Sequence, residues 1–280
     1  MRARHSGILR LVAPDALVVE NLEKYFPPSH SGWRGLLQPF ARPTLRALGG
    51  VTFRVAPGHV LALIGANGAG KSTLLRILTT LLLPTRGRVE VAGSDVVREP
   101  ARVRRQIGYH TGADGGFYGR LSARENLEFF AALNNLTLRD ARRQIARVTE
   151  LLRLGAVLDR QVRTLSTGTV HRLGLARAIL HSPALLLLDE PTRSLDPLAA
   201  AEFRRFLKDD LVRQHGTTLV FASHTLAEVE QLAGRVALLD AGVLLACDTL
   251  RGLLASSGAA TLEQALEKLT GGHAAAEVPS

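Results

Sequence analysis

Nine consecutive residues have the types and spacing of a loop that holds phosphate groups. They satisfy the pattern G-x-x-x-x-G-K-[ST], and the run consists of Gly65, Ala66, Asn67, Gly68, Ala69, Gly70, Lys71, Ser72 and Thr73. Glycines let backbone N–H groups point inward around phosphate oxygens, and the N-terminus of a following helix adds partial positive charge. The Lys71 ammonium can reach the terminal phosphates, and the Ser72 hydroxyl can ligate Mg²⁺. The run therefore predicts a site for a phosphorylated ligand and Mg²⁺.

Two carboxylates follow a second apolar run. Residues 185–188 are four leucines, which predict a buried strand, and Asp189 and Glu190 come directly after them. We assign Asp189 to the Mg²⁺ shell and Glu190 to the general base that polarises an attacking water. His224 follows another apolar strand, residues 219–223, and should project from the same edge of the sheet toward the terminal phosphate. A purely structural or solvated role for His224 stays open.

The elements that must position these residues predict an α/β fold. The apolar run 60–64 is typical of a buried strand and leads straight into the glycine-rich loop, after which residues 74–83 have helical apolar density. We expect further helices at 172–180 and 199–214 and further strands at 16–19, 51–55, 184–188, 218–223 and 236–239. Strands that alternate with helices favour a parallel sheet covered on both faces. The prediction is a P-loop NTPase (RecA-like) core with a parallel or mixed sheet.

An inserted α-helical subdomain interrupts this core. Ser122 and Glu125 have capping-box spacing, which predicts a helix through Leu133, and a second amphipathic helix is expected over 138–154. The division that we predict is a flexible N-terminus at 1–15, a first core part at 16–111 with an inserted loop at 27–47, a helical subdomain at 112–169, a second core part at 170–254, and a short tail at 255–280 with one helix at 262–269.

Composition excludes several classes of protein. Cys247 is the only cysteine, which excludes an intramolecular disulfide and a cysteine-rich metal site. No stretch reaches the roughly 18 consecutive apolar residues of a membrane-spanning helix, and we expect no secretory signal. The net charge of +10 comes almost wholly from arginine. Such a balance could result from nucleic-acid binding, from an anionic membrane surface or from an arginine-biased composition. The arginines are scattered and not interleaved with aromatic residues, which favours the biased composition, with membrane proximity second, and we do not expect nucleic acid as a partner.

With these motifs in place, the chain resembles the nucleotide-binding domain of ABC transporters over about residues 16–254. The discriminating segment is Leu165, Ser166, Thr167, Gly168 and Thr169, which resembles the family signature LSGGQ. By resemblance, Ser194, Leu195 and Asp196 match the D-loop, and His224 matches the switch histidine. Phe26, or alternatively Tyr25, fits the aromatic position on which adenine stacks.

The resemblance implies ATP and Mg²⁺ as cofactors and an ATPase activity coupled to transport. Ser166 and Gly168 would contact the γ-phosphate held by a second ATP-binding subunit, so that two copies form a head-to-tail homodimer. A separately encoded membrane-spanning subunit would be the other partner, with the chain peripheral at the cytoplasmic face of the cell membrane. The short tail resembles exporter subunits of the ABC-2 type.

Two departures from the family pattern stand out. Gly112 occupies the position where most relatives carry a glutamine that meets magnesium, so that Asp114 or Gln106 would have to substitute, or coupling would do without this group. Thr167 and Thr169 replace a glycine and the glutamine of the signature. The alternative functions are a soluble ABC-type ATPase that acts on nucleic acid or the ribosome, and a phosphate-loop kinase.

Overall fold

The computed structural model describes residues 15–27, 45–112 and 116–276, with side chains described to residue 271. Most of the predicted loop 27–47 and nearly all of the predicted flexible N-terminus lie outside these residues. Asp114, proposed as a substitute for the missing glutamine, lies outside them as well.

A six-stranded central sheet has the order β10-β9-β3-β8-β7-β6. Its strands are β3 (Val60–Ile64), β6 (Ile107–Thr111), β7 (Leu185–Asp189), β8 (Thr218–Ala222), β9 (Arg235–Asp240) and β10 (Val243–Thr249). The strands from β6 to β9 are parallel to their neighbours, and only β10 is antiparallel. The sheet is therefore mixed, which agrees with the predicted parallel or mixed sheet.

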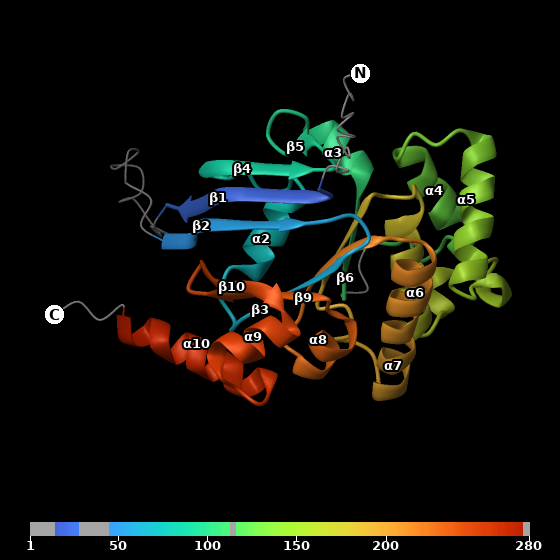
Figure 1. Ribbon diagram of the computed structural model, residues 1–280. Helices are drawn as coiled ribbons and strands as arrows, with labels where there is room; N and C mark the ends of the chain where they lie inside the picture. Colours follow the sequence, from blue (N-terminus) through green and yellow to red (C-terminus); the bar gives the residue numbers. More distant parts are fainter. Residues whose placement is uncertain (1–14, 28–44, 113–115, 277–280) are drawn as a thin grey trace, which may run out of the picture.

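Both faces of this sheet are covered, which is why its strands are continuous apolar runs. Alternate residues point to opposite faces: Leu61 and Leu63 belong to one hydrophobic cluster, and Ala62 and Ile64 belong to the other. The first cluster includes α2 (Lys71–Leu78) and an additional sheet, and α2 lies between the two sheets (Figure 1).

That additional sheet is antiparallel, with the order β2-β1-β4-β5, and sequence reasoning did not predict it as a unit. Its strands are β1 (Leu17–Phe26), β2 (Leu45–Val55), β4 (Arg86–Val91) and β5 (Ser94–Asp95). The predicted strands 16–19 and 51–55 were too short, and the predicted loop ends at residue 44 rather than 47. The reason is that β1 and β2 remain paired as far as Phe26 and Leu45, beyond the predicted strand ends. Register shifts between the two strands break the alternation of apolar residues there, so the pattern did not indicate a strand.

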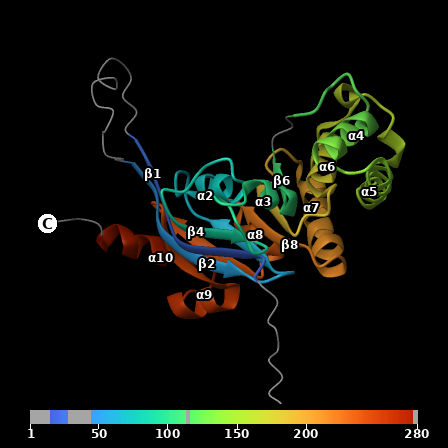
Figure 2. The ribbon, with the colours of Figure 1, turned by 90° about the horizontal axis from the view of Figure 1, so that it is seen from above.

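The helices α4 (Ala123–Leu133) and α5 (Leu138–Leu151) of the helical subdomain lie with α6 (Thr167–Ile179) at one side of the molecule (Figure 2), and α6 also packs against β6. Short 3₁₀ turns at Gly155–Val157 and Val162–Thr164 connect α5 to α6. The remaining helices are α3 (Pro100–Gln106), α7 (Pro197–Arg205), α8 (Leu226–Leu232), α9 (Leu250–Ser257) and α10 (Leu262–Ala276), and a π-helical segment, Phe206–Gln214, continues α7.

Several helix boundaries differ from the predicted ones for identifiable reasons. The signature helix begins at Thr167 rather than at residue 172, because Ser166 caps it. The helix predicted over 74–83 ends at Leu78, because Thr80 adopts a positive φ of 61° that breaks the helix despite the apolar residues beyond it. The tail helix predicted to end at residue 269 continues to Ala276.

The capping box predicted at Ser122 is present. Ser122 Oγ accepts from the Glu125 backbone N–H at 3.1 Å, and Glu125 Oε2 accepts from the Ser122 N–H at 2.7 Å. Ser122→Ala should therefore lower the free energy of unfolding by about 1 kcal/mol, whereas Ser122→Gly should cost only a few tenths because glycine is also a good N-cap. Urea unfolding followed by circular dichroism checks this order. Equal losses in both variants would contradict it.

Candidate functional site

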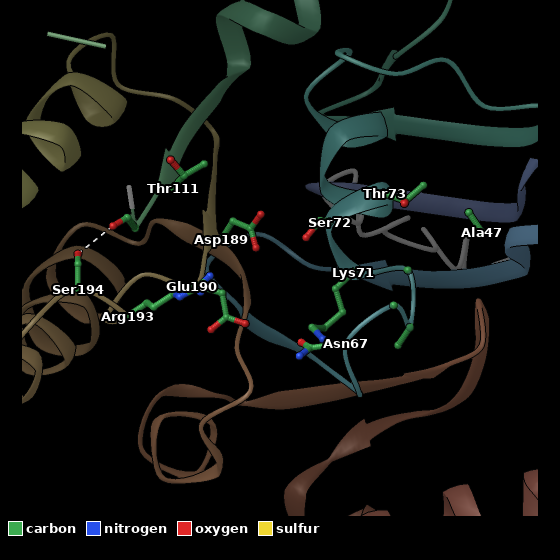
Figure 3. A pocket seen from close by; sticks show the side chains of 14 residues that line it. Ala47, Asn67, Lys71, Ser72, Thr73, Thr111, Asp189, Glu190, Arg193 and Ser194 are labelled. Atoms are coloured by element: carbon green, nitrogen blue, oxygen red, sulfur yellow. Dashed lines mark hydrogen bonds between the residues drawn. The ribbon is translucent and has the colours of Figure 1, made fainter. Parts of the chain in front are cut away.

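A cleft of about 610 Å³ opens at the carboxyl ends of β3, β6 and β7. The residues that line it come from the phosphate loop, the strand ends, the turn after β7 and β2 of the additional sheet, and they are Ala47, Asn67, Gly68, Ala69, Gly70, Lys71, Ser72, Thr73, Thr111, Gly112, Asp189, Glu190, Arg193 and Ser194. The carboxyl ends of parallel strands meet at one sheet edge, which is why segments far apart in sequence gather here. Figure 3 shows the phosphate loop facing Asp189 and Glu190 across the cleft.

The conformation of the phosphate loop depends on two glycines. Gly65 has a φ of 147°, and a Cβ there would lie 2.0 Å from the Leu239 carbonyl oxygen. Gly70 has a φ of 103°, and a Cβ there would lie 2.7 Å from the Ala47 carbonyl oxygen. Only glycine fits both the backbone angle and the space. Gly70 is also the N-cap of α2 and provides no side-chain cap, so the first N–H groups of α2 are left for an anion.

Lys71 is buried, and its ammonium lies inside the loop. Nζ donates to the carbonyl oxygens of Gly65 at 2.6 Å and Ala66 at 3.0 Å. Burial lowers the pKa of Lys71, and the nearby carboxylates of Glu190 and Asp189 act in the opposite direction. A buried ammonium that faces a phosphate-sized cleft attracts the charge of a polyphosphate more strongly than an exposed one.

Asp189 and Ser72 form an oxygen pair at the edge of the cleft. Burial raises the pKa of Asp189, and repulsion from Glu190 adds to this, while a hydrogen bond from Ser72 and the charge of Lys71 partly oppose it. A carboxylate and a hydroxyl are ligands that Mg²⁺ prefers. A divalent cation between them would also relieve the repulsion between Asp189 and Glu190. The two predicted metal residues therefore fit the ion.

Glu190 and His224 form a contact pair that the sequence placed on different strands. His224 Nδ1 lies 2.6 Å from Glu190 Oε2, and the carboxylate accepts this hydrogen bond. The His224 side chain is 60% exposed and that of Glu190 only 22%, and Glu190 lines the cleft whereas His224 does not. Glu190 has a φ of 51°, a conformation that costs a non-glycine residue roughly 1–2 kcal/mol. Its backbone N–H donates to the Ala222 carbonyl oxygen at 3.0 Å, which holds this turn against β8.

Gly112 packs its backbone against this turn. Its N–H donates to the Asp189 carbonyl oxygen at 3.0 Å, and its own carbonyl accepts from Ser194 Oγ at 2.8 Å, the dashed line in Figure 3. A Cβ at Gly112 would lie 2.3 Å from the Glu190 carbonyl oxygen. The missing side chain is therefore a steric requirement of this approach. Gln106, considered above as a replacement, does not line the cleft.

The signature-like segment, residues 165–169, does not line the cleft either. Ser166 caps α6, where its Oγ accepts from the Thr169 N–H at 3.4 Å and lies 2.9 Å from Thr169 Oγ1. Thr169 is buried, while Ser166 and Thr167 are exposed. The substitution of glutamine by Thr169 thus gives the cap a second hydroxyl.

The other predicted residues are divided between structural contacts and the cleft. Asp196 is the N-cap of α7 and accepts from the N–H groups of Leu198 and Ala199, each at 3.0 Å. Leu195 packs against the core, and of the D-loop residues only Ser194 lines the cleft. Phe26 is half-buried, with Lys24 Nζ 5.1 Å from its ring centroid, and neither it nor Tyr25 lines the cleft. Their adenine-stacking role stays a prediction.

Sequence reasoning missed Thr111 and Arg193, which line the cleft. Thr111 pairs with Asp189 at the ends of neighbouring parallel strands. The expected parallel sheet contained this signal, because the last residue of any strand beside β7 must lie at the same edge. Arg193 comes from the turn after Glu190, and its position depends on turn geometry that the sequence pattern does not specify.

Comparison with known proteins identifies the family. A family model described as "ABC transporter" matches residues 48–193. The chain belongs to the ABC transporter family. It is 32% identical over 215 residues to the ABC transporter ATP-binding protein NatA of Bacillus subtilis, with 77% of this chain and 87% of that protein covered.

Further relatives agree with the predicted kinship to ABC-2 type exporters. The daunorubicin resistance ATP-binding protein DrrA3 of Streptomyces coeruleorubidus is 40% identical over 226 residues, which cover 80% of this chain and 70% of that protein. The bacitracin transport ATP-binding protein BcrA of Bacillus licheniformis is 37% identical over 195 residues, which cover 70% of this chain and 62% of that protein.

Solved structures match the fold of this ABC transporter protein. The structure of cbiO1 from Clostridium perfringens superposes with a TM-score of 0.74 at 23% identity, over 86% of this chain and 91% of that one. A structure described as the ATP binding subunit of an ABC transporter gives 0.74 at 26% identity, over 91% and 99%. The predicted fold class is confirmed, and ATP hydrolysis is the reaction of this family. No helix within the described residues is long and apolar enough to span a membrane.

The Gly112 contact generates a counterintuitive prediction. Gly112→Gln, which introduces the residue usual in ABC transporter proteins, should lower the ATPase turnover by about 10- to 100-fold, because its Cβ must displace the Glu190 backbone. Steady-state ATPase assays test this. Gly112→Ala is the matched control, since it adds the same Cβ without the amide and should lose a similar amount. Increased turnover in Gly112→Gln would show that the contact is not required.

Proposed function

We propose that this chain is the ATP-hydrolysing subunit of an exporter, and that its cleft at the sheet edge holds ATP and Mg²⁺. The observation that supports this most directly is the convergence of the phosphate loop, Asp189 and Glu190 on one cleft. The names of its relatives support export, since two of them refer to daunorubicin resistance and to bacitracin transport.

The residues of the cleft divide the chemistry among them. The N–H groups of residues 65–73 and the Lys71 ammonium bind the phosphates and hold them in position. Ser72 and Asp189 would hold Mg²⁺, which when bound neutralises charge on the phosphate oxygens. Glu190 orients the attacking water and accepts its proton. His224, hydrogen-bonded to Glu190 Oε2, orients that carboxylate and stands at the rim where the γ-phosphate would lie.

Two copies are needed for a complete site. The segment 165–169 does not line the cleft of its own chain, yet Ser166 and Gly168 lie at the N-terminus of a helix, where an anion is stabilised. We infer a head-to-tail homodimer in which this segment of one copy covers the nucleotide of the other. Ser194 and Asp196 would lie between the two sites.

A separate membrane-spanning subunit completes the assembly that we propose. The named relatives are ATP-binding proteins of transport and resistance systems, which fits a chain that is peripheral at the cytoplasmic face of the membrane. The alternative, a soluble ATPase that acts on nucleic acid or the ribosome, is not favoured by any of these relatives.

Removal of the Lys71 ammonium tests the phosphate site. Lys71→Ala should weaken ATP binding by about 10- to 100-fold, as expected for a lost hydrogen bond to a charged group, and should abolish hydrolysis. Lys208→Ala is a matched control, because Lys208 donates to the Gln231 carbonyl oxygen on another helix and lies outside the cleft. Calorimetric titration with ATP measures the difference, and unchanged affinity in Lys71→Ala would refute the assignment.

Replacement of the Glu190 carboxylate separates binding from hydrolysis. Glu190→Gln keeps the size of the side chain and loses the base, so hydrolysis should fall by about 10²- to 10⁴-fold while ATP binding persists. The ATP-bound homodimer should then accumulate, which size-exclusion chromatography with light scattering would detect. A variant that no longer binds ATP would place Glu190 in binding rather than in water activation.

A further inference from the structure

Three segments that the proposed function uses are carried by three different elements. Gly112 directly follows β6, Ser166 caps α6, and Asp196 caps α7. These elements meet at a buried point around His171, which is 1% exposed. His171 belongs to α6, and its ring contacts His110 of β6 on one side and Phe203 of α7 on the other.

The geometry of the histidine contact is specific. His110 is 3% exposed, and its Nε2 lies 3.2 Å from Nε2 of His171. The ring centroids are 4.6 Å apart, with the planes at 81°. An N···N contact at this distance requires that one imidazole donates and the other accepts, so the two rings must adopt complementary protonation. Two apolar side chains would impose no such condition.

The His110 ring packs closely against the backbone of α6 at Gly174. A Cβ at Gly174 of α6 would lie 2.7 Å from His110 Cε1 and 2.9 Å from Nδ1. A Cβ at Gly108 would lie 2.2 Å from the Ala178 carbonyl oxygen, so β6 and α6 are packed backbone to backbone. The height of α6 along β6 is therefore fixed by these close contacts together with the imidazole pair.

The charge state of His110 is also fixed. Burial lowers the pKa of His110 to about 3, with further contributions from His171 and Arg177. His110 is consequently neutral at physiological pH. A neutral imidazole can serve as the donor or the acceptor of a single N–H···N hydrogen bond in an interior where water does not compete.

The pair lies close to both segments that it connects. His171 is five residues from Ser166 along a continuous helix, which is about 7.5 Å of axial rise. His110 is two residues from Gly112 along β6. A helix moves as a rigid body over this length, so a shift of α6 against β6 at His171 displaces Ser166 and Gly168 by a similar distance.

We propose that His110 and His171 are positioning residues for ATP hydrolysis, which set the signature segment of one copy at the height where it meets the nucleotide held by the other. The inference rests on the proposed head-to-tail homodimer. It predicts that loss of the pair leaves ATP binding by a single chain intact, because the pair lies outside the phosphate loop, and impairs the ATP-driven association of two chains.

The experiment measures these two steps separately in the Glu190→Gln background. In His171→Leu, the affinity of the isolated chain for ATP should stay within about twofold of the parent, whereas the ATP-dependent dimer should dissociate about tenfold more readily. His171→Gln, whose amide can still hydrogen-bond to His110, should recover most of the dimer affinity. With Glu190 intact, His171→Leu should show a lower kcat at an unchanged KM for ATP, and His171→Gln should recover most of that kcat.

Two further variants keep the test decisive. Val148→Ala, in the core of the same helical subdomain, matches the loss of stability and should leave dimer affinity at the parental value. Gly174→Ala retains both imidazoles but displaces the His110 ring, so it should weaken the dimer as His171→Leu does, even if His171→Leu fails to fold. Parental dimer affinity in His171→Leu or in Gly174→Ala would overturn the positioning role. A parent that binds ATP and never dimerises would instead overturn the proposed homodimer.

Discussion

The parallel arrangement of β3, β6, β7 and β8 is the constraint on which the rest of the site depends. Parallel strands end at the same edge, so the chain must turn four times within a small volume, and each turn brings its own polar groups. The turns contribute the phosphate loop, Gly112, Glu190 and His224. Each face of the sheet is buried in its own hydrophobic cluster, so the residue types in the strands are restricted to apolar ones. The polar residues of the site therefore lie in these loops or at the strand ends. The cleft is therefore a consequence of sheet topology before it is a consequence of any single side chain.

The charged side chains and the backbone are crowded at this edge of the sheet. The crowding has an electrostatic cost, which a nucleotide would offset, and a steric cost at Glu190. Lys71 is buried among carbonyl oxygens, and the pKa of Asp189 is raised by burial and by the charge of Glu190. A polyphosphate with a divalent cation would place negative charge beside the Lys71 ammonium and positive charge beside the Asp189 carboxylate. Glu190 meanwhile adopts a positive φ with its carbonyl oxygen against Gly112. Strain of this kind persists only where surrounding contacts hold the backbone, and here they do so at Glu190, the residue that we propose as the general base.

How much the sequence could predict follows from which interactions are local. The run from Gly65 to Thr73 directly follows the apolar strand 60–64 and contains the turn and the helix start, so its place was predictable, as was that of Asp189 at the end of four leucines. The contact of His224 with Glu190 was only partly predictable. Their positions after two strands place both residues at the same edge of the sheet, but do not give the distance between their side chains. The outer half of β2 could not be predicted, since its pairing with β1 is long-range and interrupted by register shifts. The reason for Gly112 was hidden too, because its neighbour is a backbone atom 78 residues away in sequence.

The helix α6 carries the signature segment at its N-terminus, and its buried polar side chains contact neighbouring elements. Most of α6 is buried, and it packs against β6, α4 and α5 rather than along one amphipathic stripe. Apolar packing alone is non-directional and tolerates small shifts along the helix axis. The guanidinium of Arg177, stacked 4.9 Å from the Phe117 ring centroid and 5.0 Å from that of Phe130, ties α6 to α4 and to the segment beyond Gly112. The imidazole pair ties it to β6. These directional contacts, at His171 and at Arg177, oppose both a shift of α6 along its axis and a rotation about it. A segment at the N-terminus of α6 needs this fixed position if it is to contact a second molecule.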